Sequence, residues 1–315
     1  MVDSEIREDA AEPVHVRAPG KINLVLRVGA TAPGGYHRLA TVFQAVSLTE
    51  DISATPAEGI SVHTTGRWAH LVQDDETNLA HQAATLLADT CGITRGVQLD
   101  VVKNVPVAGG MAGGSADAAG ALLACDLLWR TGLSREELVE LAAGLGADVP
   151  FALTGGTALG AGSGGELTPA LARGMHYWVL AMSEQGVSTP EAFAAWDRNN
   201  PDPPEHPAVP DDVMTALISG DPYALAKVLV NDLSEPALEL FSGLDAVLEA
   251  FTGTAALATM VSGSGPTVAA LAPDHPAALD IAESVRAAGV ADEVAVVSGP
   301  APGARLLESV HEEEV

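Results

Sequence analysis

The residues best suited to chemistry lie in a glycine-rich stretch about one third of the way along the chain. Four glycines fall within residues 109–114, directly ahead of Ala116–Trp129, whose Ala- and Leu-rich sequence predicts a buried helix. Glycine allows positive φ and close approach of a ligand to the main chain. The free N–H groups of a first helical turn attract anions, and Ser115 is placed to cap the helix. The stretch therefore predicts an anion cradle suited to phosphate; a glycine turn needed only for packing is the alternative.

Three other polar residues are candidates for the same chemistry. Lys21 and Asn23 are two positions apart in a predicted strand, so in extended backbone they project to the same face. Lys21 alone would be read as a solvated strand lysine. Asp148 lies between apolar residues shortly before a proline, where an acid is either a local hydrogen-bond cap or an active-site carboxylate.

Apolar periodicity predicts the elements that must position these residues. Residues 14–28 read as two strand segments interrupted at Pro19-Gly20, and residues 41–48 and 97–102 read as further strands. Asn78–Thr90 has helical spacing, with Thr77 or Asn78 as its cap, and Ser134 with Glu137 forms a capping box. Later elements are a strand at 175–182, helices at 211–219, 222–230, 236–250 and 276–288, and a strand at 293–297. Between them, five prolines within residues 199–212 predict an irregular connector.

Two more glycine-rich stretches need separate interpretations. Residues 260–271 form a strand and glycine loop that either converges with the first loop on one ligand or serves only as a packing turn. Residues 160–165 fit the GxGxxG pattern literally, but Pro169 follows where a dinucleotide-binding helix should begin. A Rossmann site is therefore rejected.

Composition excludes several classes of function. A formal charge of −27 argues against nucleic acid as a partner, because a polyphosphate needs a basic face. Two cysteines predict a reducing compartment without a disulfide framework, and no CxxC or HExxH metal pattern is present. The N-terminus carries no apolar signal segment and no apolar run is long enough for a membrane, so a cytoplasmic protein is predicted.

Three blocks together resemble the GHMP small-molecule kinase family, and they occur in the family's order: Ala18–Asn23, Pro106–Ala119 and Ser262–Thr267. Matches run from about residue 14 to 305. Further details point to a member whose substrate carries a cytidine: Gly35-Tyr36-His37, Gly146–Phe151 and Asn231-Asp232-Leu233.

The resemblance implies an α+β fold of two domains with the active site in the cleft between them. The expected division is a disordered tail at 1–13, a nucleotide-binding domain at 14–165, a substrate domain at 166–305 and an acidic tail at 306–315. The implied activity is ATP-dependent phosphorylation of an alcohol, by a monomer or weak dimer. A sibling kinase of homoserine or mevalonate is one alternative, and a nucleotide-binding regulator that has lost catalysis is another.

The resemblance also implies roles for individual residues. Asp148 is the general base toward the substrate hydroxyl, and Lys21 is its electrostatic partner. The predicted ATP-binding residues are Asn78, Leu79, Lys103, Pro106, Val107, Ala108, Gly109, Gly110, Met111, Ala112, Gly113, Gly114 and Ser115, with Ser115 also nearest to Mg²⁺. The predicted substrate-binding residues are Tyr36, His37 and Phe43 at the cytidine end, and Asn23 and Thr189 nearer the reacting hydroxyl.

One residue departs from the family pattern. The loop usually reads Gly-Leu-Gly-Gly-Gly-Ser, whereas this chain has Ala112 at the third position. A positive φ costs an alanine about 1 kcal/mol. The conformation of the loop at Ala112 is therefore left open, although the anion site is still expected.

Overall fold

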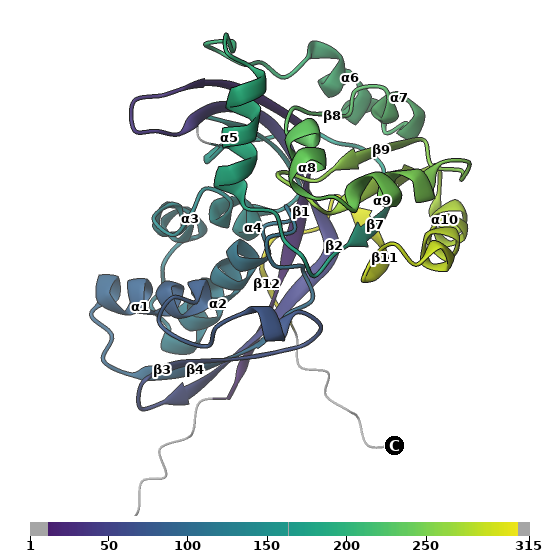
Figure 1. The fold of residues 1–315 in the computed structure, drawn as a ribbon. Helices are drawn as coiled ribbons and strands as arrows, with labels where there is room; N and C mark the ends of the chain where they lie inside the picture. Colours follow the sequence, from purple (N-terminus) through teal and green to yellow (C-terminus); the bar gives the residue numbers. More distant parts are fainter. Residues whose placement is uncertain (1–11, 163, 308–315) are drawn as a thin grey trace, which may run out of the picture.

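The computed structural model describes residues 12–162 and 164–307, and within these ranges the strands form an eight-stranded and a four-stranded sheet. The larger sheet has the order β12-β1-β2-β4-β3, with β5 and β8 joined to its long strands and β6 joined to β5. The smaller sheet has the order β11-β7-β10-β9. Helices α1 and α2 lie near β3 and β4, α3 and α4 lie beside α2, and α6–α10 lie near the smaller sheet (Figure 1). The arrangement is α+β, as predicted.

Two long strands organise the larger sheet. β1 (Val14–Thr31) pairs antiparallel with β2 (His37–Ala57), and the register shifts between Pro19 and Lys21. The prediction of two separate segments was wrong, because a bulge accommodates the proline without ending the strand. β4 (Gly96–Val102) and β3 (Ile60–Thr65) extend this sheet on one side, and the end of β4 leads into the glycine-rich loop.

Helix α2 (Gly113–Trp129) packs on β1 and β2 and is buried around most of its circumference, as the sequence predicted. Close packing depends on small residues, since a Cβ at Gly120 would lie 2.3 Å from Ile52 Cδ1. The predicted start and cap were wrong. Ala112 takes a left-handed conformation at the N-cap position, so the helix begins at Gly113 and Ser115 lies in its first turn.

Two helices near α2 begin at the capping residues that the sequence predicted. Asn78 Oδ1 accepts from the Ala80 amide 2.9 Å away at the start of α1 (Leu79–Cys91), and Ser134 forms the predicted capping box of α3 (Arg135–Ala143). The short helix α4 (Val149–Thr154) follows Asp148. A 3₁₀ turn, η1, spans Ala69–Leu71.

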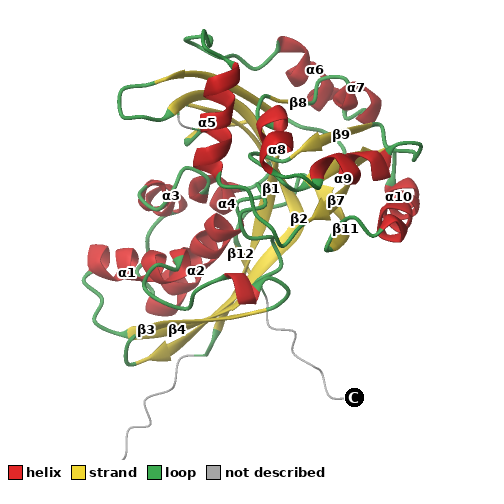
Figure 2. Ribbon diagram, in the orientation of Figure 1, coloured by secondary structure: helices red, strands yellow, loops and turns green. Residues whose placement is uncertain are grey.

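The smaller sheet comprises β7 (His176–Met182), β9 (Ala258–Val261), β10 (Val268–Ala272) and β11 (Glu293–Gly299), and α9 and α10 pack against it (Figure 2). The helices of this later part of the chain are α5 (Thr189–Asn199), α6 (Asp211–Ser219), α7 (Pro222–Ala226), α8 (Ser234–Leu240), α9 (Leu244–Phe251) and α10 (His275–Ala288). The single helix predicted at 236–250 is two helices that meet near Gly243. The helix predicted at 222–230 ends at Ala226.

Several later segments return to the larger sheet. β5 (Thr157–Ala161) and β6 (Glu166–Pro169) form an antiparallel pair, which agrees with the rejection of a Rossmann site. β8 (Val230–Asn231) and β12 (Arg305–Leu306) each pair with β1. The division of the chain at residue 165 stays a prediction. Apart from residues 12, 13, 306 and 307, the predicted tails lie outside the described residues.

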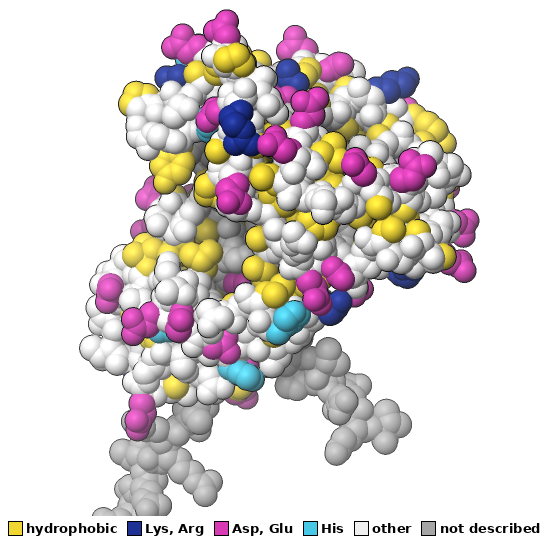
Figure 3. Space-filling model, viewed as in Figure 1, with side chains coloured by type: hydrophobic (Ala, Val, Ile, Leu, Met, Phe, Trp, Pro, Cys, Tyr) yellow, Lys and Arg dark blue, Asp and Glu magenta, His cyan; other side chains and the backbone are white. Residues whose placement is uncertain are grey.

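The surface carries many acidic side chains, which are spread over the face shown in Figure 3, with few Lys and Arg among them. Within residues 12–162 and 164–307, none of the helices combines the length and the apolar character that a bilayer crossing requires.

Candidate active site

One cavity of about 780 Å³ collects most of the predicted site residues from segments far apart in the sequence. Its lining comes from β1 and β2, the glycine-rich loop, the segment before α4, α5 and the second glycine-rich loop. The predicted residues that line it are Lys21, Asn23, Tyr36, Phe43, Leu79, Pro106, Ala108, Gly109, Gly110, Ala112, Gly113, Gly114, Ser115, Asp148 and Thr189.

The glycine-rich loop forms one wall of this cavity. Ala108, Gly110 and Ala112 have φ values of 49°, 77° and 58°, so the chain turns repeatedly before α2 begins. Two loop residues predicted to bind ATP, Val107 and Met111, are absent from the cavity lining in the described part of the chain. Met111 is fully buried and packs in an apolar cluster behind the loop.

Lys21 is anchored to this loop through both its backbone and its side chain. Its amide donates to the Met111 carbonyl at 3.1 Å, and its ammonium donates to Gly110 O at 2.9 Å and to Asn23 Oδ1 at 2.7 Å. Asn23 in turn donates through Nδ2 to Thr41 Oγ1 at 2.9 Å. Burial lowers the pKa of Lys21, and the negative charge of Asp148 opposes that shift.

Asp148 is half-buried and faces the same cavity from the segment between α3 and α4. It occupies the N-cap position of α4, but its side chain makes no capping hydrogen bond. The interpretation of Asp148 as a local cap is therefore wrong. Among the described residues it also forms no direct salt bridge, so its carboxylate is available to a ligand.

The residues predicted to hold the cytidine end are divided between two places. Tyr36 is 74% exposed at the rim of the cavity. His37 does not line the main cavity but borders an adjoining hollow of about 370 Å³, together with Tyr36 and Thr189. Phe43 lies deeper, with Lys21 Nζ 5.6 Å from its ring centroid, and it packs on Phe151.

Phe193 is a cavity residue that the sequence analysis missed. Its ring stacks on His37 with centroids 4.9 Å apart, and it lines both the main cavity and the adjoining hollow. The signal was present, since Thr189 and Phe193 are four positions apart and therefore share one face of α5.

Lys103 and Asn78 are placed behind the cavity wall. Lys103 is 1% exposed, and its ammonium contacts Glu50 Oε1 at 2.5 Å and Asp117 Oδ2 at 2.7 Å. Burial works to lower the pKa of Lys103, but the two carboxylates together raise it. Neither Lys103 nor Asn78 is part of the cavity lining in the residues described.

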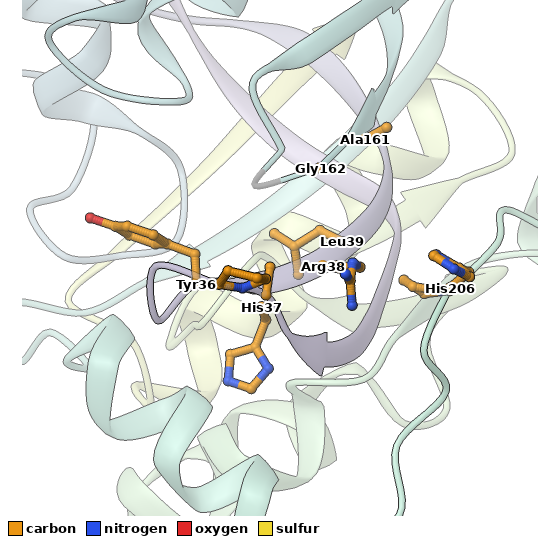
Figure 4. A pocket seen from close by; sticks show the side chains of 10 residues that line it. Tyr36, His37, Arg38, Leu39, Ala161, Gly162 and His206 are labelled. Atoms are coloured by element: carbon orange, nitrogen blue, oxygen red, sulfur yellow. The ribbon is translucent and has the colours of Figure 1, made fainter.

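A separate hollow of about 460 Å³ opens beside Tyr36 (Figure 4). Arg38 and His206 border it with Leu39 and Gly162. The hollow shares Tyr36 and Leu39 with the main cavity, so the two spaces adjoin at these residues. Lys21 lines the main cavity and does not line this hollow.

The second glycine-rich loop reaches the same cavity through Gly263 and Ser264. Ser264 Oγ lies 2.9 Å from Thr189 Oγ1 on α5, and Ser262 Oγ donates to Gly110 O at 3.0 Å. The two loops therefore meet at one cavity, and their convergence on one ligand stays a prediction.

Family models match two parts of the chain. The model of the GHMP kinases N terminal domain matches residues 78–156, and the model of the GHMP kinases C terminal domain matches residues 213–291. The 4-diphosphocytidyl-2-C-methyl-D-erythritol kinase of Leifsonia xyli subsp. xyli is 51% identical over 94% of this chain and 99% of its own length. The chain belongs to the GHMP kinase family, in its 4-diphosphocytidyl-2-C-methyl-D-erythritol kinase branch.

Other comparisons agree with this GHMP kinase assignment. The 4-diphosphocytidyl-2-C-methyl-D-erythritol kinase of Streptomyces coelicolor is 50% identical over 94% of this chain and 99% of its own length. A crystal structure of 4-(cytidine 5'-diphospho)-2C-methyl-D-erythritol kinase has 30% identity and a TM-score of 0.75, and covers 91% of this chain and 99% of its own. The L. major mevalonate kinase in complex with R-mevalonate shares the fold, with a TM-score of 0.73 at 16% identity. The predicted fold and the predicted small-molecule kinase class are confirmed.

Proposed function

We propose that this GHMP kinase transfers the γ-phosphoryl group of ATP to the 2-hydroxyl of 4-diphosphocytidyl-2-C-methyl-D-erythritol, a step in the non-mevalonate route to isoprenoid precursors. The observation that carries the proposal is that Lys21, Asp148 and the glycine-rich loop line one cavity. Phosphoryl transfer needs mainly positioning and stabilisation of charge, and this cavity offers both.

ATP lies in this proposal with its phosphates along residues 109–115, beside the first turn of α2. Backbone N–H groups of the loop and of that turn supply the positive potential, which accounts for an ATP site in a protein with few basic residues. Leu79 borders the same cavity and contributes an apolar wall for the nucleoside.

The substrate hydroxyl lies between Asp148 and Lys21. Asp148 accepts the hydroxyl proton as the oxygen attacks the γ-phosphorus, and the bond from that phosphorus to the ADP oxygen breaks. The Lys21 ammonium stabilises the negative charge on the attacking and transferred oxygens. Two acceptors, Asn23 Oδ1 and Gly110 O, already hold that ammonium, so it is oriented before the substrate arrives.

The residues present also fit Mg²⁺ carried by the nucleotide. Ser115 lines the cavity in the first turn of α2, next to the loop proposed for the phosphates. The described residues contain no cluster of three or more His, Cys, Asp or Glu side chains that could hold a metal ion. Mg²⁺ is commonly held by few protein groups together with substrate phosphates, and it would neutralise phosphate charge beside Ser115.

The cytidine end lies at the outer part of the cavity. Tyr36 and Phe193 border the same adjoining hollow, so Phe193 replaces Phe43 in this proposal as the second aromatic side chain for the base. His37 supports Phe193 by stacking and also contacts Gly29 O at 3.0 Å. Homoserine and mevalonate carry no base, so this aromatic region favours the cytidylyl substrate over those of the sibling kinases.

The test supplies purified protein with ATP, Mg²⁺ and one acceptor at a time, and monitors ADP release. We expect turnover with 4-diphosphocytidyl-2-C-methyl-D-erythritol and none with homoserine or mevalonate. Turnover with homoserine but not with the cytidylyl compound would overturn the substrate assignment. Nucleotide binding without turnover of any acceptor would favour the regulator alternative. The proposal also includes a cytoplasmic location and a monomer or weak dimer.

A further inference from the structure

Two motifs have no part in the chemistry above although they lie next to it. These are Asn231-Asp232-Leu233 and the loop that begins at Ser262. Ser262 is fully buried and does not line the cavity, whereas its neighbours Gly263 and Ser264 do. The hydroxyl of Ser262 nevertheless contacts the first glycine-rich loop, because it donates to Gly110 O at 3.0 Å.

Gly110 O is the shared acceptor of two donors. The Lys21 ammonium donates to the same oxygen at 2.9 Å. A carbonyl oxygen has two lone pairs, so both hydrogen bonds can form at once. Gly110 has a φ of 77°, which glycine adopts readily, and it packs closely against the second loop, since a Cβ at Gly110 would lie 1.8 Å from Ser262 O. The Ser262 hydroxyl therefore belongs to the groups that fix the direction of the Gly110 carbonyl.

The second loop is itself held in place from behind. Asn231 Nδ2 donates to Val261 O at 2.8 Å and to Gly263 O at 2.7 Å, on either side of Ser262. Asn231 lies on β8, which pairs with β1 at Val25 and Leu26, a few residues after Lys21. A chain of hydrogen bonds therefore runs from β8 through the second loop to Gly110 and Lys21.

The fit around the ammonium leaves little freedom. A Cβ at Gly263 would lie 2.9 Å from Gly110 O and 3.3 Å from Lys21 Nζ, so the second loop packs directly against the lysine's anchor. We propose that Ser262, held by Asn231, is a positioning residue that turns the Gly110 carbonyl toward the Lys21 ammonium and so aims this ammonium at the transferred phosphoryl group. The inference rests on the proposed function.

The variant Ser262→Ala tests this role. We expect kcat to fall about tenfold, because a small displacement of a charged group is costly in phosphoryl transfer, while KM for ATP and for the alcohol changes less than about twofold. Ser284→Ala is the matched control, because Ser284 also donates to a backbone carbonyl, at 2.9 Å, but on the exposed side of α10. Ser262→Cys keeps the size and a weak donor, and it should give an intermediate kcat.

The same substitution made in a Lys21→Ala protein distinguishes positioning of the ammonium from general support of the fold. If Ser262 acts through Lys21, Ser262→Ala should leave the residual single-turnover rate of a Lys21→Ala protein unchanged. An equal loss in both backgrounds, or a rise in KM for ATP with unchanged kcat, would overturn the inference. If thermal melting shows that the Ser262→Ala protein is unfolded, the same comparison is made with the Ser262→Cys protein. Failure of the proposed function looks different, since the native chain itself would then release no ADP with the cytidylyl substrate.

Discussion

Lys21 and Asp148 face one cavity from different parts of the chain and are electrostatically coupled without a direct salt bridge among the described residues. The negative charge of Asp148 favours the ammonium form of Lys21, while burial disfavours it more strongly. A hydroxyl placed between the two groups would meet a proton acceptor on one side and a cation on the other.

The variant Asp148→Asn should keep the shape of the site and remove the base. We expect kcat to fall by about 10²–10⁴-fold, the usual contribution of a positioned general base, with both ligands still bound. ADP release and calorimetric titration of each ligand would measure the two effects. Glu136→Gln, which removes an exposed acid from α3, is the matched control. An Asp148→Asn protein with full activity would remove the base assignment.

The rate should also depend on the protonation of Lys21. Because burial lowers its pKa below the ordinary 10.5, the ammonium loses its proton earlier as pH rises, and kcat should fall on the alkaline side below that value. A guanidinium stays charged throughout this range. In Lys21→Arg, any remaining activity should therefore lack this alkaline decline. An identical decline in both proteins would assign it to another group.

The aromatic residues of the outer cavity lead to a prediction about specificity. Phe193→Leu keeps an apolar side chain but removes the ring that stacks on His37 and borders the hollow with Tyr36. Stacking on a base contributes about 1–3 kcal/mol, so KM for the cytidylyl substrate should rise roughly tenfold or more, with KM for ATP unchanged. Phe43→Leu, beside Lys21, should lower kcat instead. The reverse pattern would favour Phe43 as the stacking residue.

The loop at Ala112 offers a prediction about stability. An alanine at a φ of 58° is strained, and glycine relieves that strain at some cost in chain entropy. Ala112→Gly should therefore raise the free energy of unfolding by about 0.5–1 kcal/mol in urea titrations. Ala116→Gly, inside α2, should lower it by about 1 kcal/mol or more. If both variants lost stability equally, the strain at Ala112 would be refuted.

Local signals in the sequence were sufficient for much of the fold and for the glycine-rich loop, whereas other residues of the cavity wall, such as Leu79 and Thr189, were predicted only through the family resemblance. The caps at Asn78 and Ser134 were predictable because each depends only on residues within one helical turn. The burial of Lys103 was not, because it depends on Glu50 and Asp117, which come from a strand and a helix distant in sequence. Phe193 was missed for a related reason, since its role depends on contact with His37, which lies far earlier in the chain.

The buried cluster of Lys103, Glu50 and Asp117 gives stability a dependence on pH. Burial raises the pKa of Glu50 to about 8 against the attraction of Lys103, and burial likewise raises the pKa of Asp117. The groups facing Glu50 are Lys103, Asp117 and the backbone amides of Asn104 and Val105.

The direction of this pH dependence follows from the protonation of Glu50 in the folded and the unfolded chain. Between the ordinary value of 4.5 and about 8 the folded chain retains the Glu50 proton that the unfolded chain has lost. The stabilising contribution is therefore complete below 4.5 and is lost as the pH rises through about 8. Within this window the free energy of unfolding should decrease with pH, by at most about 1.4 kcal/mol per pH unit for one proton.

The variant Glu50→Gln cannot titrate, so its free energy of unfolding should vary less with pH than that of the native chain across this window. Its absolute stability should be lower, because an amide N–H₂ group cannot accept the hydrogen bonds that both oxygens of the Glu50 carboxyl group accept from Lys103 and from the amides of Asn104 and Val105. Urea titrations at several pH values would measure both quantities. Glu58→Gln, which removes an exposed acid directly after β2, should keep the native slope. A Glu50→Gln protein with the native slope would mean that Glu50 does not hold this proton, and the dependence would then belong to Asp117.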